Sequence, residues 1–209
     1  MRSVDLVLAD DIRNCTRCPL WEKQEPGAKH VPGVVGSNYR PRGLAILADH
    51  PRYYEAKSGV PFQGPTGGLL DTLLQHVGLT RDDLMITHGV RCRPPGNRIV
   101  DYPEAVVTCD SWTADEMAAY DPSVIVLMGR EALQSIFGKE ASVGATRGAL
   151  TALPAKHPWR AGGGTRLCLP TYAPAAASFG GGLDSEPGQA IIEDLKAAVA
   201  TAAAMWEVI

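Results

Sequence analysis

The chain has 209 residues, is 45% hydrophobic and 21% charged, and carries a formal net charge of -3, so the molecule as a whole has no attraction to nucleic acid. No apolar run approaches the roughly 20 residues of a membrane-spanning helix, and acidic residues stand where an export signal needs an uncharged segment, which predicts a cytoplasmic protein without a membrane span. The length suits a single domain, residues 1–209, whose core needs no disulfides.

The N-terminal segment, residues 1–42, is predicted to be an arm that binds a metal centre. Apolar residues among acids predict a short helix over residues 3–13. In a reducing compartment, cysteines with CxxC spacing indicate metal ligands before disulfides. Four thiolates are the number that a [4Fe-4S] cluster or a structural zinc ion requires, so one site could join the arm to the rest of the chain. The four candidates are Cys15, Cys18, Cys92 and Cys109, with Cys168 left over.

The rest of the chain alternates between short apolar runs and helical patterns. Apolar runs that are typical of strands occur at residues 43–48, 83–90, 122–129, 143–153 and 165–170. Helical patterns cover residues 69–77, 103–120, 130–137 and 187–205, and loops are expected at residues 22–42, around Tyr53 and at 156–164. This alternation predicts an α/β fold, a three-layer αβα sandwich with a short, mostly parallel central sheet.

Chemically active residues follow several of the predicted strands. Asp49 and His50 follow the first strand, His88 ends the second, and residues 171–174 follow the last. Parallel sheets bind ligands at the carboxyl ends of their strands, so these residues are expected around one crevice. Each of them alone would also suit a turn or a helix cap. Their joint placement is what predicts a site, and the glycines of residues 64–68 could let a ligand approach the start of the next helix.

Three arginines, Arg91, Arg93 and Arg98, crowd the segment around Cys92. They could form a local basic surface for nucleic acid even though the net charge is negative. A solvated basic loop is the alternative.

Taken in order, the motifs resemble those of the iron-sulfur uracil-DNA glycosylases, the family 4 branch of their superfamily. The matching segments are CxxCxL at residues 15–20, GxPFxGxxGxLLD at 59–71, CRPPGNR at 92–98, Cys109, VLMGREAL from Val126 and TYxP from Thr171. The resemblance covers nearly the whole chain. It implies a uracil-DNA glycosylase-like αβα fold, a [4Fe-4S] cluster on the four cysteines with zinc as the rival, and DNA with a flipped base as the partner of a monomeric protein.

The resemblance also implies a pocket, and this sequence departs from the family there. Phe62 takes the position of the aromatic residue on which the flipped base stacks. In place of the family's GEAPG motif this chain has Ala48-Asp49-His50-Pro51-Arg52, in which Asp49 keeps a carboxylate. His88 stands in place of the family's asparagine, which reads the edge of the uracil ring. Ala173 stands where the family has a histidine. The substrate-binding residues are then Phe62, Ala48, Pro51, Thr171 and Ala173, and the catalytic residues Asp49, His50 and His88.

Three hypotheses follow for the function. The first is a divergent iron-sulfur DNA glycosylase that cleaves the N-glycosidic bond of a damaged or modified base, with Asp49 as the acid and His88 as reader or donor. The second is a homologue that binds DNA or a modified base without hydrolysis. The third is other chemistry on a flipped base, with His50 or His88 as nucleophile. His157, in the second His-Pro pair of the chain, could replace the missing donor if its loop reaches the pocket.

Overall fold

The computed structural model describes residues 3–22, 43–160 and 166–207. Within them a five-stranded sheet runs in the order β2-β1-β3-β5-β4. Strands β2, β1, β3 and β5 pair in parallel, and β4 pairs antiparallel with β5. The strands are β1 Leu44–Ala48, β2 Met85–His88, β3 Val124–Met128, β4 Thr151–Ala152 and β5 Leu167–Thr171. The predicted mostly parallel sheet is confirmed.

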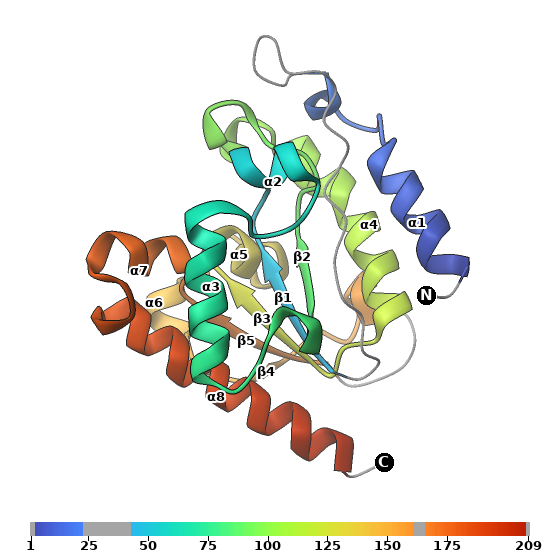
Figure 1. Ribbon diagram of the computed structural model, residues 1–209. Coiled ribbons are helices and arrows are strands. Elements are labelled where there is room, and N and C mark those ends of the chain that lie inside the picture. The colour runs from blue at the N-terminus through green and yellow to red at the C-terminus, as the bar shows by residue number, and fades with distance from the viewer. Residues whose placement is uncertain (1–2, 23–42, 161–165, 208–209) are drawn as a thin grey trace.

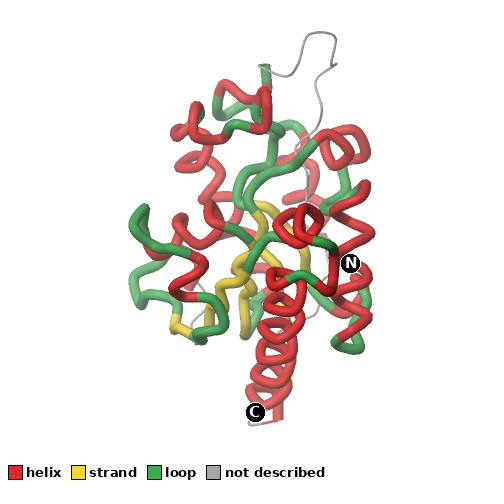
Figure 2. The backbone as a smooth tube through the Cα atoms, turned by 90° about the vertical axis from the view of Figure 1, so that its left-hand side faces the viewer, coloured by secondary structure: helices red, strands yellow, loops and turns green. Residues whose placement is uncertain are grey.

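Helices cover both faces of the sheet, which makes the three layers of the predicted sandwich (Figure 1). Helices α3 (Gly64–His76) and α8 (Glu186–Glu207) pack on one face, and α4 (Pro103–Tyr120) and α5 (Arg130–Phe137) pack on the other. The strands therefore lie inside the molecule, between helical layers (Figure 2). The remaining helices are α1 Ser3–Arg13, α2 Tyr53–Ser58, α6 Val143–Thr146 and α7 Pro174–Gly180.

Strand β1 lies second in the sheet and is buried along its whole length. Its side chains alternate between the two faces, as the pleat of a strand requires. Leu44, Ile46 and Ala48 pack toward α3 and α8, whereas Ala45 and Leu47 pack toward α4 and α5. This two-sided burial explains why the strand is continuously apolar in the sequence. The polar residues that follow it emerge at the carboxyl edge of the sheet.

Two local predictions were wrong. The expected loop around Tyr53 is helix α2, which is stabilised at its start because the Glu55 carboxylate accepts a hydrogen bond from the Arg52 N–H over 3.0 Å. The strand expected over residues 143–153 is reduced to the two residues of β4, and helix α6 takes its first part. Helix α7 was not expected. Residues 23–42 and 161–165 of the two predicted loops lie outside the described part of the chain.

The N-terminal segment packs on α4 through a third apolar cluster. Ile12 of α1 and Leu20 are fully buried there, against Ile99 and Trp112. The cysteine-bearing segment is thereby held on the α4 side of the sheet, where Figure 1 shows α1 beside α4. Among the described residues, no helix combines the length and the apolar character that crossing a bilayer would require.

Candidate functional site

A small pocket lies at the carboxyl ends of β1 and β2, between the α2–α3 connection and the start of α7. Its volume is about 60 Å³. Six of the residues that the sequence predicted for a base-binding site meet there: Ala48, Asp49, His50, Phe62, His88 and Ala173. The lining is completed by Arg52, Glu55, Thr66, Met128, Pro174 and Ala175. Residues from five separate stretches of the chain therefore converge, as the strand-end rule predicts.

Two predicted substrate-binding residues do not line this pocket. Pro51 is buried next to His50 but outside the lining. Thr171 still belongs to β5, and its hydroxyl donates a hydrogen bond to Asp194 Oδ2 on α8 over 2.7 Å. Thr171 is therefore held in the layer between the sheet and α8, and only Ala173, two residues later, reaches the pocket.

The aromatic ring of Phe62 is positioned by a tightly packed loop. Phe62 has a left-handed backbone with a φ of 51°, and a Cβ on Gly67 would lie 1.9 Å from the Phe62 carbonyl oxygen. The Arg81 guanidinium donates hydrogen bonds to the carbonyls of Pro61 and Gly67, each over 2.9 Å. Glu55 joins this loop to the one after β1, because it also accepts a hydrogen bond from the Gln63 N–H over 3.1 Å. Gly67 therefore makes room for protein backbone, not for a ligand as the sequence suggested.

The two pocket histidines are buried, and no hydrogen bond links their rings to another side chain or backbone group in the described part of the chain. The His88 ring stacks on Phe62, with 5.8 Å between the ring centroids and 20° between the planes. Both ring nitrogens of His50 and the Nδ1 atom of His88 are buried and unpaired. Burial is the main cause that lowers the pKa of His50 to about 4 and of His88 to about 3, with nearby arginines adding to it. Both imidazoles are thus neutral at pH 7, and each can offer one donor and one acceptor.

Asp49 leaves the end of β1 toward the N-terminus of α5. Its Oδ1 atom accepts a hydrogen bond from the Ala132 N–H over 2.9 Å. Gly129 makes this approach feasible, because its φ is +106° and a Cβ there would lie 2.9 Å from Asp49 Oδ2. Burial first, and then the hydrogen-bonding and charge effects of the neighbouring Glu131 carboxyl group, hold the pKa of Asp49 well above its usual range.

The pKa of Glu131 shifts in the opposite direction from that of Asp49. Burial acts to raise its pKa, but the hydrogen bonds with Asp49 and with Arg130 outweigh burial and lower it. The Arg130 guanidinium donates to Glu131 Oε1 over 3.1 Å. The pKa of Asp49 is thus raised and that of Glu131 is lowered.

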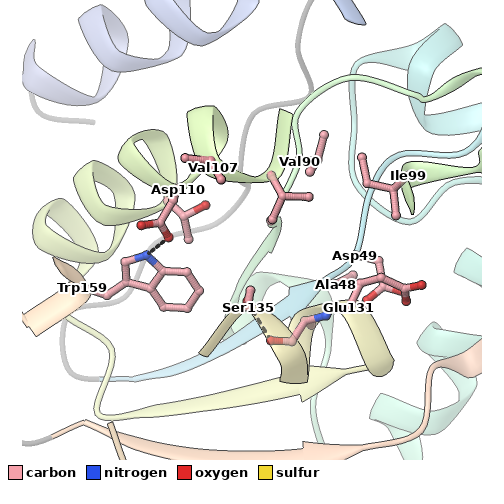
Figure 3. Close-up of a pocket in the computed structure, with 13 residues that line it drawn as sticks. Ala48, Asp49, Val90, Ile99, Val107, Asp110, Glu131, Ser135 and Trp159 are labelled. Carbon is pink, nitrogen blue, oxygen red and sulfur yellow. Dashed lines mark hydrogen bonds between the residues drawn. The ribbon is translucent and has the colours of Figure 1, made fainter. Parts of the chain in front are cut away.

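A second cavity lies on the other side of Asp49, between α4 and α5. Its volume is about 240 Å³, and Ala48 and Asp49 line it as well as the first pocket. Figure 3 shows Trp159 on one side of this cavity and Asp49 with Glu131 on the opposite side. The Trp159 indole N–H donates a hydrogen bond to Asp110 Oδ1 over 2.8 Å. Asp49 is thus part of a wall between two cavities.

The four cysteines of the predicted metal centre gather in the apolar cluster that joins α1 to α4. Cys92 and Cys109 are buried in this cluster, and Cys15 and Cys18 pack against it. The Trp112 indole N–H donates a hydrogen bond to Cys15 Sγ over 3.3 Å. The guanidinium of Arg17 covers the Trp112 ring at 3.8 Å from its centroid. Cys168 is buried in β5, in a different cluster from the other four.

The thiol environment fits a cationic cluster. Burial, followed by the proximity of the other thiols, raises the pKa of Cys92 to about 12, and burial is the main cause that raises the pKa of Cys109 to about 11. Thiolates in such a place need a positive partner, which iron or zinc would supply. Among the described residues, no group of three or more His, Cys, Asp and Glu side chains is arranged as a ready site for one metal ion. A [4Fe-4S] cluster binds each thiolate to a different iron, whereas zinc gathers four around one ion.

The arginines near Cys92 have different environments. Arg91 is buried, with its guanidinium 2.9 Å from the Glu116 carboxylate, so the prediction of a DNA-facing role was wrong for this residue. Arg98 is exposed and pairs with Asp101. Arg93 donates a hydrogen bond to Asn97 and lies 5.7 Å from the Tyr53 ring centroid.

His157 does not enter the pocket. Its ring packs edge-on against Trp159, with 4.7 Å between the centroids. It therefore lies near the second cavity and cannot replace a donor beside His88.

Sequence reasoning missed three residues that shape the pocket: Glu55, Arg81 and Glu131. The rule that located Asp49 could have located Glu131, because Glu131 follows β3, which lies next to β1. Glu55 was placed in a loop, and Arg81 has no motif around it. Their roles depend on long-range hydrogen bonds that no local pattern encodes.

Comparisons with known proteins place the sequence among one group of relatives. The family description "Uracil DNA glycosylase superfamily" matches residues 38–196. A type-4 uracil-DNA glycosylase of Saccharolobus solfataricus is 32% identical over 184 residues, which are 86% of this chain and 79% of that protein. The type-4 enzyme of Pyrobaculum aerophilum is 31% identical, covering 83% of this chain and 92% of that protein. The type-4 enzyme of Archaeoglobus fulgidus is 35% identical over 66% of this chain and 65% of that protein.

Proposed function

The chain belongs to the uracil-DNA glycosylase superfamily, and from that premise we propose that it is a divergent iron-sulfur DNA glycosylase. It takes a damaged or modified base into the pocket formed by Asp49, Phe62 and His88 and cleaves the N-glycosidic bond. The convergence of these three side chains with Ala173 at the strand ends is the observation that carries the proposal.

The pocket has the chemistry that a flipped base needs. The Phe62 face can recover part of the stacking that a base loses when it leaves the duplex. The neutral His50 and His88 rings offer donors and acceptors to the base edge, because both nitrogens of His50 and Nδ1 of His88 are buried without a partner among the described residues. The volume of about 60 Å³ is small, so we expect a single-ring base to be preferred over a purine.

The mouth of the pocket offers groups that suit nucleic acid. Arg52 lines the pocket and is exposed, and Arg93 lies near the Tyr53 ring. Tyr53 and Tyr54 are about half exposed, at 52% and 51%. Cations bind phosphates and exposed aromatic rings stack on unpaired bases, which supports a DNA strand along helix α2.

We further propose that Cys15, Cys18, Cys92 and Cys109 hold a [4Fe-4S] cluster. Such a cluster, when bound, would cross-link α1, the segment after β2 and α4 through iron-sulfur bonds. The burial of the thiols and their raised pKa values support a cationic partner at this place.

Ala173 favours a second candidate function, a homologue that binds a base without hydrolysis. A methyl group cannot stabilise the negative charge on a departing base, and loss of one such donor costs about 10²–10³ in rate. The two functions differ in whether the glycosidic bond is broken.

The first test uses anaerobically purified protein with oligonucleotides that carry uracil, 5-hydroxymethyluracil, hypoxanthine or xanthine. We expect alkali-labile sites at one of the pyrimidines, with at least a ~10²-fold loss of rate in Asp49→Asn and in Phe62→Ala. Asp115→Asn, on the exposed face of α4, is the matched control and should leave the rate unchanged.

Two other outcomes would contradict the proposed glycosylase function. DNA binding without cleavage of any of the four substrates would favour the binding homologue. A stable protein-DNA adduct that disappears in His50→Gln or His88→Gln would favour covalent chemistry through a histidine.

A further inference from the structure

An indole N–H group points at one of the four cysteine sulfurs. Trp112 follows Cys109 by three residues on α4, and residues three apart share a helix face, so both side chains meet the N-terminal segment. The Trp112 Nε1–H group donates a hydrogen bond to Cys15 Sγ over 3.3 Å. The roles in this bond are fixed, because an indole nitrogen can only donate. Cys15 Sγ is therefore the acceptor.

A positive charge accompanies this hydrogen bond. The Arg17 guanidinium lies 3.8 Å from the centroid of the Trp112 ring, and it donates a hydrogen bond to Ser111 Oγ over 3.4 Å. Trp112 itself is only 4% exposed, whereas Cys15 is partly exposed. An N–H donor and a cation therefore lie together beside a thiol that solvent partly reaches.

Both groups would act on the charge of a bound cluster. A [4Fe-4S] cluster with four thiolates becomes more negative by one charge when it takes up an electron, and its sulfur atoms share that charge. Hydrogen bonds to these sulfurs and nearby cations stabilise the reduced state more than the oxidised state, so they raise the reduction potential. Burial of the other thiols acts in the opposite direction, because water no longer solvates the added charge.

We propose that Trp112 and Arg17 raise the reduction potential of the cluster. The inference rests on the proposed [4Fe-4S] cluster and is independent of base excision. Neither residue would bind iron: Trp112 acts through Cys15 Sγ, and Arg17 acts through its charge beside the Trp112 ring. The cluster would lose an electron less readily than it would without this hydrogen bond, which suits a centre that cross-links α1, the segment after β2 and α4.

The hydrogen bond can be removed in the full-length protein, purified without oxygen. Trp112→Phe keeps an aromatic ring at the buried position and deletes the N–H donor. By protein-film voltammetry we expect the reduction potential to fall, so that the ratio of reduced to oxidised cluster at a fixed applied potential drops about threefold. At about 59 mV per tenfold for a one-electron couple, this is a shift of about 28 mV.

The charge is tested separately at an exposed side chain, where a substitution should not disturb folding. We expect Arg17→Gln to lower the potential too, and this shift to shrink at high salt, which screens exposed charges, while the shift in Trp112→Phe persists. Trp159→Phe is the matched control. It removes another buried indole N–H group, which donates to Asp110 over 2.8 Å in a different apolar cluster, and should leave the potential unchanged.

Iron content per chain and the melting temperature identify a variant that has lost its cluster or its fold. An iron-bearing parent protein whose potential falls in neither Trp112→Phe nor Arg17→Gln would overturn the inference. If Trp112→Phe loses its iron, the inference stands or falls on the potential of Arg17→Gln. A parent protein without iron would overturn the proposed cluster and this inference together. Absence of base excision would contradict the proposed glycosylase alone, since the potentials are measured without a substrate.

Discussion

Ala173 brings a methyl group to the pocket wall where the resembling family has a histidine. Its backbone is extended, with φ -70° and ψ 144°, and it caps the N-terminus of α7. Any side chain can adopt this conformation. The backbone at this position would therefore accept a histidine without strain.

At this residue we expect Ala173→His to raise the rate of uracil excision about 10²-fold, because it adds a donor to the departing base. The change is measured as a single-turnover rate on a uracil oligonucleotide. Ala176→His, on the same helix but outside the pocket lining, is the control and should leave the rate unchanged. An Ala173→His variant as slow as the parent would mean that position 173 does not face the departing base.

The site residues show what could be predicted from sequence at this scale. Asp49, His50 and His88 were found because each follows a strand, and Phe62 and Ala173 because they stand in recognisable motifs. The influence of Glu131 on Asp49 and the clamp by Arg81 were missed. Glu131 is 82 residues from Asp49, and Arg81 is 20 and 14 residues from Pro61 and Gly67, so these partners meet only after folding.

At the scale of elements, helices α4 and α5 were predicted with the bounds that the structure has, because a proline or a glycine marks the start and apolar spacing the rest. Helix α2 was missed because its stability comes from Glu55, which reaches back to Arg52 and across to Gln63. In the segment predicted as a long strand, Arg147 instead reaches α8, where it pairs with Asp194. In both segments, contacts with distant parts of the chain determine the secondary structure.

The cysteine cluster connects three elements, so losing one ligand should affect them together. We expect Cys92→Ser to lose iron and to lower the melting temperature, because the remaining thiols no longer complete a four-thiolate site. Iron content per chain and the visible absorbance of anaerobic protein give the measurement. Cys168→Ser is the matched control: Cys168 is also buried but lies in another cluster, so its variant should keep its iron. Unchanged iron and unchanged stability in Cys92→Ser would refute the cluster assignment.

At the scale of the whole molecule, the buried histidines make stability depend on pH. The pKa of His50 is lowered to about 4 and that of His88 to about 3, from the usual 6.5. Between those values and 6.5 the unfolded chain binds protons that the folded chain does not, so acid favours unfolding. Stability is fully present above about pH 6.5 and is lost as the pH falls toward 4, by about 1.4 kcal/mol per pH unit for each histidine.

We therefore expect His88→Gln to lose less stability between pH 7 and pH 4 than the parent protein, by on the order of 3 kcal/mol. Urea unfolding at a series of pH values measures this difference. His76→Gln is the control, since His76 is exposed at the end of α3. If all three proteins lose stability in parallel, the histidine at position 88 is not buried in its neutral form.

The alternation of β1 continues past the end of the strand and decides toward which helical layer each polar side chain points. Ala45 and Leu47 face α4 and α5, and Asp49 follows them to that side, while His50 follows Ile46 and Ala48 to the side of α3. A deletion or an insertion of one residue within β1 would exchange the two faces and turn Asp49 away from Glu131. Homologous chains should therefore vary in length in their loops but not between Leu44 and His50, even where the residues themselves differ.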